Sequence, residues 1–496
     1  MATIERVATR KNLLPYDGLR GWIDKVAELG DLRIVEGADC ATDIGMATEL
    51  LQHHADAPSV IFDAIPGFPK GHRVIVNQFG TTARIALTFG LPTDLKKGEL
   101  SLRMLQKIEQ SKIIPAEFVE EGPVLENTQI GDAVNVDLFP SPRWHELDGG
   151  AYIGTGSFDV TRDADTGDVN LGTYRVMSMD RKTVGFYISP GKHGRIHRDK
   201  YWERNEPLPA LIVVGGDPLL LLAACTELPY GVSEYDWVGG VRGAAYPVIK
   251  GRVTGLPMPA DAEIVFEGYV AKDVKRVEGP FGEWAGYYAS GAREEPVLDI
   301  KAVYYRNNPI VNGFPPQVPP DEQQRFRAIQ RSALLQQELA KASVPGVTQC
   351  WCHEAGGARM FVAVSIKQLY PGHARQVGHV AAMCHVGAYA GRYIIVVDDD
   401  IDVTNLEELM WAVSTRSDPA TSIDIIPRAW STPLDPRISP EDKKAGKMMN
   451  SRAVIDATRP WEWREQFPAV NRPSPQWRKK SEEKWGWVVN RVGKKA

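Results

Sequence analysis

The stretch Val277-Glu-Gly-Pro-Phe-Gly-Glu-Trp-Ala-Gly-Tyr-Tyr288 carries the strongest structural signal in the chain. Its two glutamates, Glu278 and Glu283, are five residues apart. On a helix that spacing would separate their side chains by about 140°, and on a strand it would put them on opposite faces. Gly279-Pro280 and Gly282 predict a turn, which would let the two carboxylates converge. Two solvated glutamates in a hairpin are the alternative, and spacing alone slightly favours that alternative.

Convergence would change the chemistry of both carboxyl groups. Each negative charge disfavours the other, so the two pKa values move apart and one group can hold a proton near neutral pH. A general acid beside an ionised partner has this requirement. Arg175, which shares a predicted strand with Asn170, is a suitable counter-charge for a buried carboxylate.

The region around this turn, from about residue 125 to 310, is rich in short β-like runs separated by turn signals. The spacing fits a barrel or packed sheets better than a doubly wound fold. The predicted strands are residues 152–160, 170–177, 183–188, 210–214, 246–253, 262–270 and 297–305.

The residues before the β-rich region predict a small α/β unit that ends near residue 120. Apolar positions at 19, 23, 26 and 29 share one helical face, and Gly30 is suited to ending that helix. Short β-like runs follow at residues 60–62 and 73–76.

The residues after it begin with a rigid, proline-rich break, FPPQVPP, at 314–320. Asp321 is then expected to cap a helix that reaches Lys341 and connects two domains. An α/β pattern follows, with a helix near 373–388 and a strand at 393–397. Thr404-x-x-Glu407 predicts a capping box that opens another helix.

The tail from about residue 455 combines charge with tryptophan. Exposed tryptophans beside charges favour a helix that docks on another subunit or domain, with a mobile tail as the alternative. The residues concerned are Trp461, Trp463, Trp477, Trp485 and Trp487.

Composition excludes several classes of protein. The 496 residues are 43% hydrophobic and carry 58 Lys+Arg against 63 Asp+Glu, a net charge of −5, which gives no electrostatic footprint for nucleic acid. The longest apolar run, Leu219–Cys225, is too short for a membrane span. The amino terminus has basic residues but no apolar segment of a secretory signal. Five cysteines, an odd number, are typical of a reducing cytoplasm.

Common catalytic and nucleotide-binding motifs are missing from the sequence: GxxxxGK[ST], a strand-to-helix GxGxxG and GxSxG do not occur. Cys350-Trp-Cys352-His353 lacks a second ligand pair, so a buried strand is favoured over a zinc site. The acidic run Asp398–Asp402 follows an apolar strand, where carboxylates can bind a metal, but a polar turn is the favoured interpretation.

Three further polar residues form an O/N ligand set. Asn170, His193 and Glu234 would suit Mn²⁺ or Mg²⁺ with a phosphate completing the coordination shell. Spacing does not show that the three meet, and each alone is better explained as a hydrogen-bonded polar residue.

Taken together, these residues resemble the UbiD family of reversible decarboxylases, from about residue 20 to 470. The resemblance is carried by Arg175 followed by Glu-x4-Glu at 278 and 283, within the highly specific run EGPFGEWAGYY. Supporting matches are Asn170, PGKH ending at His193, GVSE ending at Glu234, the DDDIDV run, and Trp411-Ala-Val-Ser-Thr-Arg416.

The resemblance implies a mixed α/β (α+β) architecture. It divides the chain into an N-terminal α/β segment (1–120), a split β-barrel cofactor domain like that of flavin reductases (121–318) and a connecting helix (319–342). A C-terminal α/β dimerisation domain (343–454) and a helical tail (455–496) follow. It also implies a homodimer or a higher homo-oligomer such as a hexamer.

The family implies prenylated FMN, made by a separate flavin prenyltransferase. Mn²⁺ (or Mg²⁺) would join its phosphate to Asn170, His193 and Glu234, and K⁺ would lie near the backbone carbonyls of Ala223, Ala224 and Thr226. The implied cofactor-binding residues are Asn170, Gly172, Arg175, Lys192, His193, Ala224, Cys225, Thr226 and Glu234.

The implied reaction releases CO₂ from a carboxylate, and Glu283 then protonates the carbon while Arg175 holds Glu278 ionised. Lys192, Trp284, Arg428 and Trp430 are the expected substrate-pocket residues. The two tryptophans favour an aromatic or heteroaromatic acid over an open acrylic acid. Val386 stands where the phenylacrylate branch has a cofactor-contacting lysine. A flavin-dependent oxidoreductase and a non-catalytic subunit of a multi-component carboxylase are the less favoured alternatives.

Overall fold

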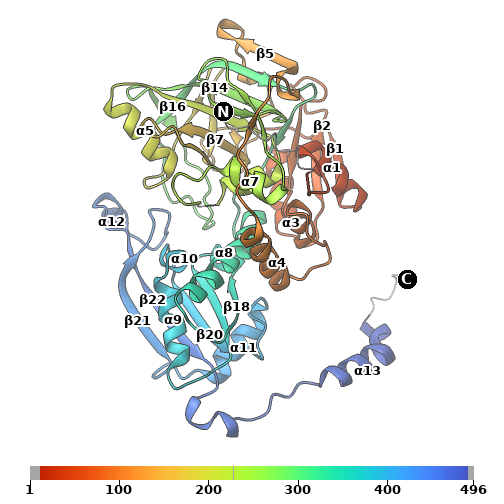
Figure 1. Cartoon of the computed structure of the whole chain (residues 1–496), viewed down its shortest axis with the longest axis vertical. Helices are drawn as coiled ribbons and strands as arrows, with labels where there is room; N and C mark the ends of the chain where they lie inside the picture. Colours follow the sequence, from red (N-terminus) through yellow and green to blue (C-terminus); the bar gives the residue numbers. More distant parts are fainter. Residues whose placement is uncertain (1–11, 227, 490–496) are drawn as a thin grey trace, which may run out of the picture.

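The computed structural model describes residues 12–226 and 228–489; residues 1–11, which belong to the amino-terminal stretch used above to argue against an export signal, lie outside this range. Two bodies are stacked along the long axis and joined by helix α8 (Figure 1). The upper body contains the N-terminal and β-rich regions, and the lower body contains residues that follow α8. No helix in the described ranges is long and apolar enough to cross a membrane.

The N-terminal region forms a four-stranded sheet in the order β1-β2-β3-β17. β17 comes from the far end of the β-rich region, so the N-terminal unit is completed by residues that the sequence assigned to the next domain. Its strands are β1 Leu32–Glu36, β2 Ser59–Asp63, β3 Arg73–Val76 and β17 Ile310–Asn312. Its helices are α1 Gly18–Glu28, α2 Asp43–Gln52, α3 Thr82–Thr88 and α4 Lys97–Gln110.

The β-rich region folds into a curled, antiparallel half-barrel with the path β6-β9-β10-β16-β14-β11-β7-β8, and β5 and β15 both pair with β16. Its interior is filled by apolar side chains such as Ile212, Phe266 and Val303. The strands are β5 Asn127–Ile130, β6 Tyr152–Gly154, β7 Ser157–Arg162, β8 Val169–Gly172, β9 Val176–Asp180, β10 Thr183–Gly185, β11 Leu208–Val214, β14 Ile264–Val270, β15 Lys275–Glu278 and β16 Arg293–Tyr305.

Two predicted strands are interrupted in the structure. The predicted strand 170–177 divides into β8 and β9, and Arg175 lies in the break between them. The predicted strand 152–160 divides at Thr155-Gly156 into β6 and β7. Helices α5 His193–Glu203, α6 Pro218–Ala224 and α7 Glu234–Arg242 lie against this region, and the short strands β4 Glu117–Phe118, β12 Pro247–Lys250 and β13 Pro257–Pro259 form a small sheet.

The connecting helix α8, Glu322–Lys341, begins after Asp321 as predicted, and the Asp321 side chain accepts a 2.7 Å hydrogen bond from the Gln324 amide. The lower body is a five-stranded sheet in the order β18-β19-β20-β22-β21. Its strands are β18 Val347–Cys352, β19 Phe361–Ile366, β20 Tyr393–Asp398, β21 Ile423–Trp430 and β22 Met449–Ala457, and its helices are α9 His373–Met383, α10 His385–Ala388, α11 Leu406–Arg416 and α12 Pro440–Lys444.

The predicted capping box at Thr404 is wrong by one residue. Asn405 caps α11, and its side-chain oxygen accepts from the amides of Glu407 and Glu408. The Thr404 hydroxyl instead donates to Asp402, which closes the preceding turn. A threonine and an asparagine in succession both suit a helix start, and the asparagine is the one with cap geometry.

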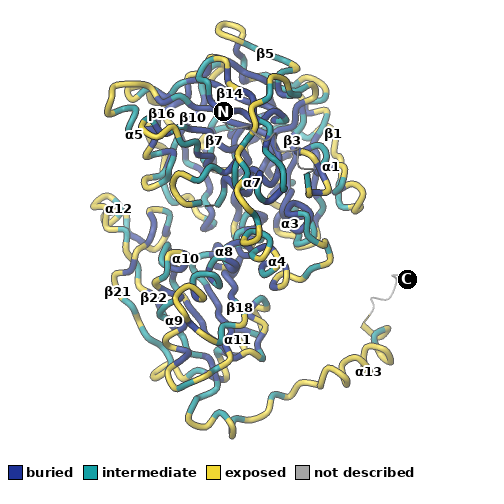
Figure 2. The backbone as a smooth tube through the Cα atoms, viewed as in Figure 1, coloured by how far each residue is buried: buried dark blue, intermediate teal, exposed yellow. Residues whose placement is uncertain are grey.

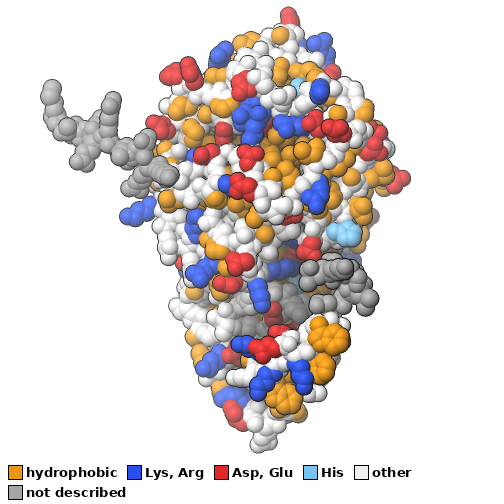
Figure 3. Space-filling model, turned by 90° about the vertical axis from the view of Figure 1, so that its right-hand side faces the viewer, with side chains coloured by type: hydrophobic (Ala, Val, Ile, Leu, Met, Phe, Trp, Pro, Cys, Tyr) orange, Lys and Arg blue, Asp and Glu red, His pale blue; other side chains and the backbone are white. Residues whose placement is uncertain are grey.

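The tail leaves the lower body and ends in helix α13, Pro475–Trp485, which stands apart from both bodies (Figure 1). Every residue of α13 is exposed (Figure 2). The molecular face on the side of the tail shows large hydrophobic side chains mixed with Lys and Arg near its lower end (Figure 3).

Candidate functional site

Arg175 joins the two glutamates that the turn was expected to bring together. Its Nε and Nη2 donate to the two carboxylate oxygens of Glu278 at 2.7 and 2.8 Å. Its Nη1 donates to Oε1 of Glu283. The side chains of Arg175 and Glu278 are almost fully buried, and that of Glu283 is mostly buried. The convergence predicted from the turn is therefore present, and the alternative of two solvated glutamates does not hold.

The loop between the two glutamates is held by close backbone packing. Glu278 ends β15 and is paired with Arg293 of β16, after which Gly279 takes a positive φ of 86°. Such a φ favours glycine. Beyond it, the Glu283 amide donates to the Tyr287 carbonyl at 3.1 Å and the Gly286 amide donates to the Glu283 carbonyl at 2.8 Å. The loop therefore holds Glu283 in one place through its own hydrogen bonds.

The two carboxyl groups have unequal surroundings. Glu278 accepts two bonds from Arg175 and a third, at 2.9 Å, from the Tyr152 hydroxyl. Glu283 receives one bond from Arg175. Burial raises the pKa of Glu283, with Arg175 opposing the rise and the Glu278 charge adding to it. Glu283 is thus the member of the pair that is better suited to hold a proton.

Two aromatic rings and one hydroxyl complete this arrangement, and sequence reasoning missed all three. The Arg175 guanidinium carbon lies 5.4 Å from the centre of the Phe281 ring and 5.6 Å from that of Tyr187. The third group is the Tyr152 hydroxyl on β6. Of the three, only Phe281 could have been predicted from its position, because it lies between the two glutamates in the sequence. Tyr152 and Tyr187 lie far from this loop in sequence.

The proposed metal ligands are neighbours in space. His193 Nδ1 lies 3.2 Å from Oδ1 of Asn170, and Oε2 of Glu234 accepts a 2.6 Å bond from the amide of Leu171, the next residue after Asn170. His193 begins α5 and Glu234 begins α7, so two helix amino termini, which favour anions, meet here.

This donor set fits a hard divalent cation bound together with a phosphate. An amide oxygen, an imidazole and a carboxylate suit Mn²⁺ or Mg²⁺. Burial raises the pKa of Glu234 to about 8, so a bound cation would be needed to keep this carboxyl group charged at neutral pH. Among the described residues, no group of three or more His, Cys, Asp or Glu side chains is placed to hold a metal ion.

Other predicted cofactor residues lie close by. Burial raises the pKa of the Cys225 thiol, and the rise is opposed by the charge of Arg327, by a hydrogen bond with Thr173 and by the charges of Arg359 and Lys192. A side chain at Gly172 would collide with the Tyr174 hydroxyl, 2.4 Å from a built Cβ, so a small residue is needed there. Thr226 follows α6, and its hydroxyl donates to the Leu222 carbonyl at 2.9 Å.

Of the four predicted substrate-pocket residues, Lys192 lies at the start of α5 beside His193, and the other three fall in two further places. Trp284 is 8% exposed and packs with Tyr389 in one apolar cluster, and the Tyr389 ring meets Trp430 at 5.1 Å in an edge-on contact. Arg428 instead lines a cavity of about 590 Å³ in the lower body, beside Arg392 and Arg437. Arg428 is therefore grouped with that cavity, whereas the two tryptophans are connected through Tyr389.

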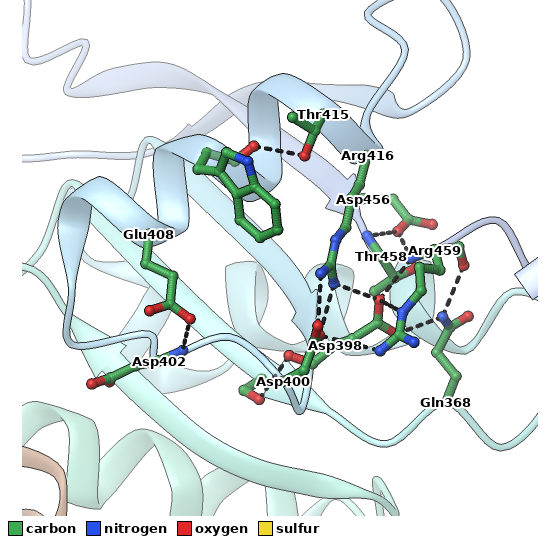
Figure 4. A network of polar contacts seen from close by, with 12 residues as sticks. Gln368, Asp398, Asp400, Asp402, Glu408, Thr415, Arg416, Asp456, Thr458 and Arg459 are labelled. Carbon is green, nitrogen blue, oxygen red and sulfur yellow. Dashed lines mark hydrogen bonds and ion pairs between the residues drawn. The ribbon is translucent and has the colours of Figure 1, made fainter. Parts of the chain in front are cut away.

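The two doubtful metal motifs take the ordinary forms that were favoured. Cys350 and Cys352 lie buried in β18, and all five cysteines are unpaired. In the acidic run, Asp398 and Asp400 form ion pairs with Arg416 and Arg459 (Figure 4). This network joins the ends of β20 and β22 to α11, so its charges are compensated by arginines.

Comparison with known proteins identifies relatives along most of the chain. Three parts of the family described as 3-octaprenyl-4-hydroxybenzoate carboxy-lyase match it: the N-terminal domain at residues 23–102, the Rift-related domain at 117–319 and the C-terminal domain at 325–457. The pyrrole-2-carboxylic acid decarboxylase of Pseudomonas aeruginosa is 30% identical over 465 residues, which cover 91% of this chain and 93% of that protein.

Solved structures share the fold over nearly the whole chain. The vanillic acid decarboxylase of Sedimentibacter hydroxybenzoicus in its open form has a TM-score of 0.82 at 28% identity, covering 97% of this chain and 100% of that one. The UbiD-class enzyme HmfF of Pelotomaculum thermopropionicum, solved in complex with FMN, has a TM-score of 0.82 at 26% identity, covering 93% and 98%.

Proposed function

The chain belongs to the UbiD family of carboxy-lyases, and from that membership we propose that it is a prenylated-FMN-dependent decarboxylase of an aromatic or heteroaromatic carboxylic acid. The observation that carries the proposal is the unequal sharing of Arg175 between Glu278 and Glu283. One carboxylate is fully clamped and the other is free to exchange a proton, as a carbon-protonating acid requires.

In the proposed reaction the bond between the ring carbon and CO₂ breaks, and its electron pair stays on the carbon. Glu283 then gives its carboxyl proton to that electron pair and is reprotonated by solvent. Arg175 and Tyr152 keep Glu278 in one orientation through three hydrogen bonds. Burial of the group strengthens these interactions and excludes competing water.

The cofactor proposed for this site is prenylated FMN, which when bound supplies the electron sink for the carbon that loses CO₂. Asn170, His193 and Glu234 would hold Mn²⁺ or Mg²⁺ with the cofactor phosphate, beside the amino termini of α5 and α7. Gly172, Lys192, Ala224, Cys225 and Thr226 are the proposed neighbours of the cofactor, and K⁺ would use the carbonyls near Ala223, Ala224 and Thr226.

The proposed substrate class follows from the relatives and the aromatic groups. One relative acts on pyrrole-2-carboxylic acid and another on vanillic acid, according to their names. Trp430 is half exposed and meets Tyr389 edge-on, a surface that suits a planar ring. Lys192 and Arg428 are proposed as further substrate contacts. An α,β-unsaturated acrylic acid is the second candidate substrate, and a flavin-dependent oxidoreductase is less favoured.

We further propose a homodimer or a higher homo-oligomer such as a hexamer, located in the cytoplasm. Five unpaired cysteines are compatible with a reducing compartment. A separate flavin prenyltransferase would supply the cofactor.

Co-expression with a flavin prenyltransferase tests the proposal. The purified protein is expected to show a visible flavin spectrum and bound manganese, and to release CO₂ from at least one acid in a panel of pyrrole-, furan- and hydroxybenzoate-type carboxylates and cinnamic acids. Turnover of the cinnamic acids alone would favour the acrylic alternative. A colourless, metal-free and inert protein would contradict the proposed function.

A further inference from the structure

The side chain of Trp284 leaves the upper body, to which its backbone belongs. Trp284 directly follows Glu283, and it is buried in a small apolar cluster. Apart from its neighbour Ala285, the members of that cluster all come from the lower body: Met360, Tyr389, Ala390 and Leu434. The side chain of Trp284, next to the proposed proton donor Glu283, is therefore packed against the lower body.

Gly357 and Arg359 of the lower body form a close-fitting site for the Trp284 indole, which we call the Gly357 socket. A Cβ built on Gly357 would lie 2.6 Å from both Cε3 and Cζ3 of Trp284, so only glycine leaves room for the ring. The guanidinium carbon of Arg359 lies 4.7 Å from the ring centre, within cation–π range. The Trp284 carbonyl accepts a 3.2 Å bond from Gln324 of α8, the helix that joins the two bodies.

The same loop has a second attachment to the lower body. Lys443 of α12 donates to the Ala289 carbonyl at 3.2 Å. Between these two attachments the loop is closed by its own bonds from Glu283 to Tyr287 and from Gly286 to Glu283. A shift of the lower body is therefore transmitted to the backbone of Glu283.

Glu278 does not share this dependence. It ends β15, which is paired with β16, and its carboxylate is held by Arg175 and Tyr152. All of these belong to the upper body. Both carboxyl groups bind Arg175 of the upper body, but only the loop that carries Glu283 is also attached to the lower body.

From these contacts we propose that Trp284 is a positioning residue that sets the place of the Glu283 carboxyl group according to how the lower body is seated. The inference rests on the proposed function and deepens it. The indole occupies the Gly357 socket instead of serving as an open platform for the substrate ring.

A positioning role for Trp284 should affect only one of the two steps of the reaction. Departure of CO₂ leaves an electron pair on the ring carbon and needs no proton, whereas the following step transfers the Glu283 proton to that pair. Loosening the indole should therefore slow the proton transfer selectively. A displacement of about 1 Å in a reacting group can cost about a hundredfold in rate.

Two exchange reactions of the cofactor-loaded enzyme separate these steps. Incorporation of solvent deuterium into the product at the reacting carbon reports proton transfer. Incorporation of labelled CO₂ into the substrate carboxylate reports bond cleavage and re-formation. For Trp284→Leu, deuterium incorporation is expected to fall about 10- to 100-fold while labelled CO₂ exchange stays within about threefold. Trp284→Phe, which keeps an aromatic ring in the socket, should recover most of the deuterium incorporation.

A matched pair of glycine variants tests the socket from its other side and does not alter the indole. Gly357 and Gly372 both lie in the lower body with positive φ, 64° and 77°, but a Cβ on Gly372 would meet nothing within 4 Å. Gly357→Ala should reproduce the selective loss of deuterium incorporation, whereas Gly372→Ala, with the same backbone strain, should leave the ratio of the two exchange rates unchanged.

Equal losses in both exchange reactions for Trp284→Leu and Gly357→Ala would overturn the positioning role, because a general structural defect affects both steps. So would an unchanged ratio of the two rates in these variants. A wild-type enzyme that is loaded with cofactor but inactive in both reactions would overturn the proposed function and this inference with it. An active wild type with no selective effect in the variants would overturn the inference alone.

Discussion

Arg175 gives two of its nitrogen atoms to Glu278 and one to Glu283, and the Tyr152 hydroxyl adds a further donor to Glu278 alone. Each added donor stabilises the charged form of the carboxylate that accepts it. The division of donors therefore separates the roles of two chemically identical side chains. It holds the Glu278 carboxylate by more donors and supports the proposal that Glu283 is the group that gives up the proton.

Tyr152→Phe tests this division. Loss of the hydroxyl removes one donor from Glu278, so Arg175 is drawn further toward Glu278 and away from Glu283. A hydrogen bond to a charged group contributes about 1.5–3 kcal/mol, and we expect kcat to fall about tenfold with KM little changed. Steady-state kinetics of the cofactor-loaded enzyme measure both quantities.

Tyr304 provides the control for that experiment. Its buried hydroxyl donates to Glu267 at 2.7 Å in the same barrel, and Glu267 has no bond to Arg175. Tyr304→Phe removes an equivalent bond and should leave kcat nearly unchanged. A similar loss of kcat in both variants would show that the barrel as a whole, and not the donor count at Glu278, is responsible.

At this scale the sequence predicted the two glutamates and Arg175, but not Tyr152. The glycines and proline between Glu278 and Glu283 indicated a turn, and Arg175 was expected as the counter-charge because of its type and the resemblance. Tyr152 carries no local signal, since it is 126 residues from Glu278 and meets it only when the sheet curls. The seating of Trp284 in the lower body could not be predicted for the same reason.

At the scale of elements, the glutamate loop is supported by the segment that precedes β6. The Gly149 amide donates to the Pro280 carbonyl at 2.8 Å, and a Cβ on Gly149 would lie 1.9 Å from the Gly279 carbonyl oxygen. Backbone on both sides leaves little room to relax. The segment therefore fixes the turn from which Glu278 and Glu283 project.

Gly149→Ala should displace that turn. We expect at least a tenfold loss of decarboxylation rate and a lower melting temperature, measured by turnover and thermal unfolding. Gly291→Ala lies in the loop that follows, where a Cβ would meet nothing within 4 Å, and should retain activity within about twofold. Wild-type activity in Gly149→Ala would contradict the close packing described here.

The amino terminus of α8 contains a buried carboxyl group that makes stability depend on pH. Burial raises the pKa of Glu322 to about 8, so the folded state keeps its proton over a range where the unfolded chain has lost it. Stability should therefore fall as pH rises from about 4.5 to about 8. Glu322 accepts from the Phe79 amide at 2.7 Å, a bond that glutamine can also accept.

Glu322→Gln should remove this contribution. We expect the variant to lose less stability than the wild type between pH 6 and pH 8, by about 1–3 kcal/mol, measured by denaturant unfolding at several pH values. Parallel stability curves for the two proteins would show that Glu322 does not titrate as described.

Elements were predicted well where the pattern is local. The helix α8 and its Asp321 cap were predicted from sequence and match the structure. The division of two predicted strands at Thr155-Gly156 and near Arg175 was not foreseen, because β-like composition continues through both breaks. Arg175 is useful to the site because it lies in such a break, and tertiary contacts with the glutamates decide that geometry.

At the scale of the whole molecule, the tail is anchored and then leaves the fold. Arg472 pairs with Glu408 at 2.7 Å, donates to the Asp400 carbonyl at 3.1 Å and lies over Trp411. Beyond it Trp477 and Trp487 are 71% and 68% exposed. Large apolar side chains left in water favour association, so docking of the tail on another subunit or domain remains our prediction.

Removal of the chain after Pro473 tests the prediction while leaving the Arg472 anchor in place. The truncated protein is expected to show a smaller assembly than the full chain in light scattering after size exclusion, with little change in melting temperature of the separate subunits. An unchanged mass would show that the oligomer does not depend on the helix.

The division of the chain into domains was predicted from the family resemblance. The order read from the residues, a β-rich region followed by a connecting helix, agrees with that division. The proposed domains come in the same order as the upper body, α8 and the lower body. However, β17 pairs with β3, so residues 310–312, which were assigned to the cofactor domain, belong to the N-terminal sheet. No local pattern predicts such a return, because pairing between distant strands is decided when the whole core assembles.

The central claim is that Glu283 delivers the proton to the carbon that loses CO₂. Its most direct test is Glu283→Gln in D₂O, with protein co-expressed with a flavin prenyltransferase and the acid that the wild type turns over. We predict a protein with an unchanged flavin spectrum and metal content that sustains no turnover of the acid and places no deuterium in the product. Turnover and deuterium incorporation at the wild-type rate would contradict the claim.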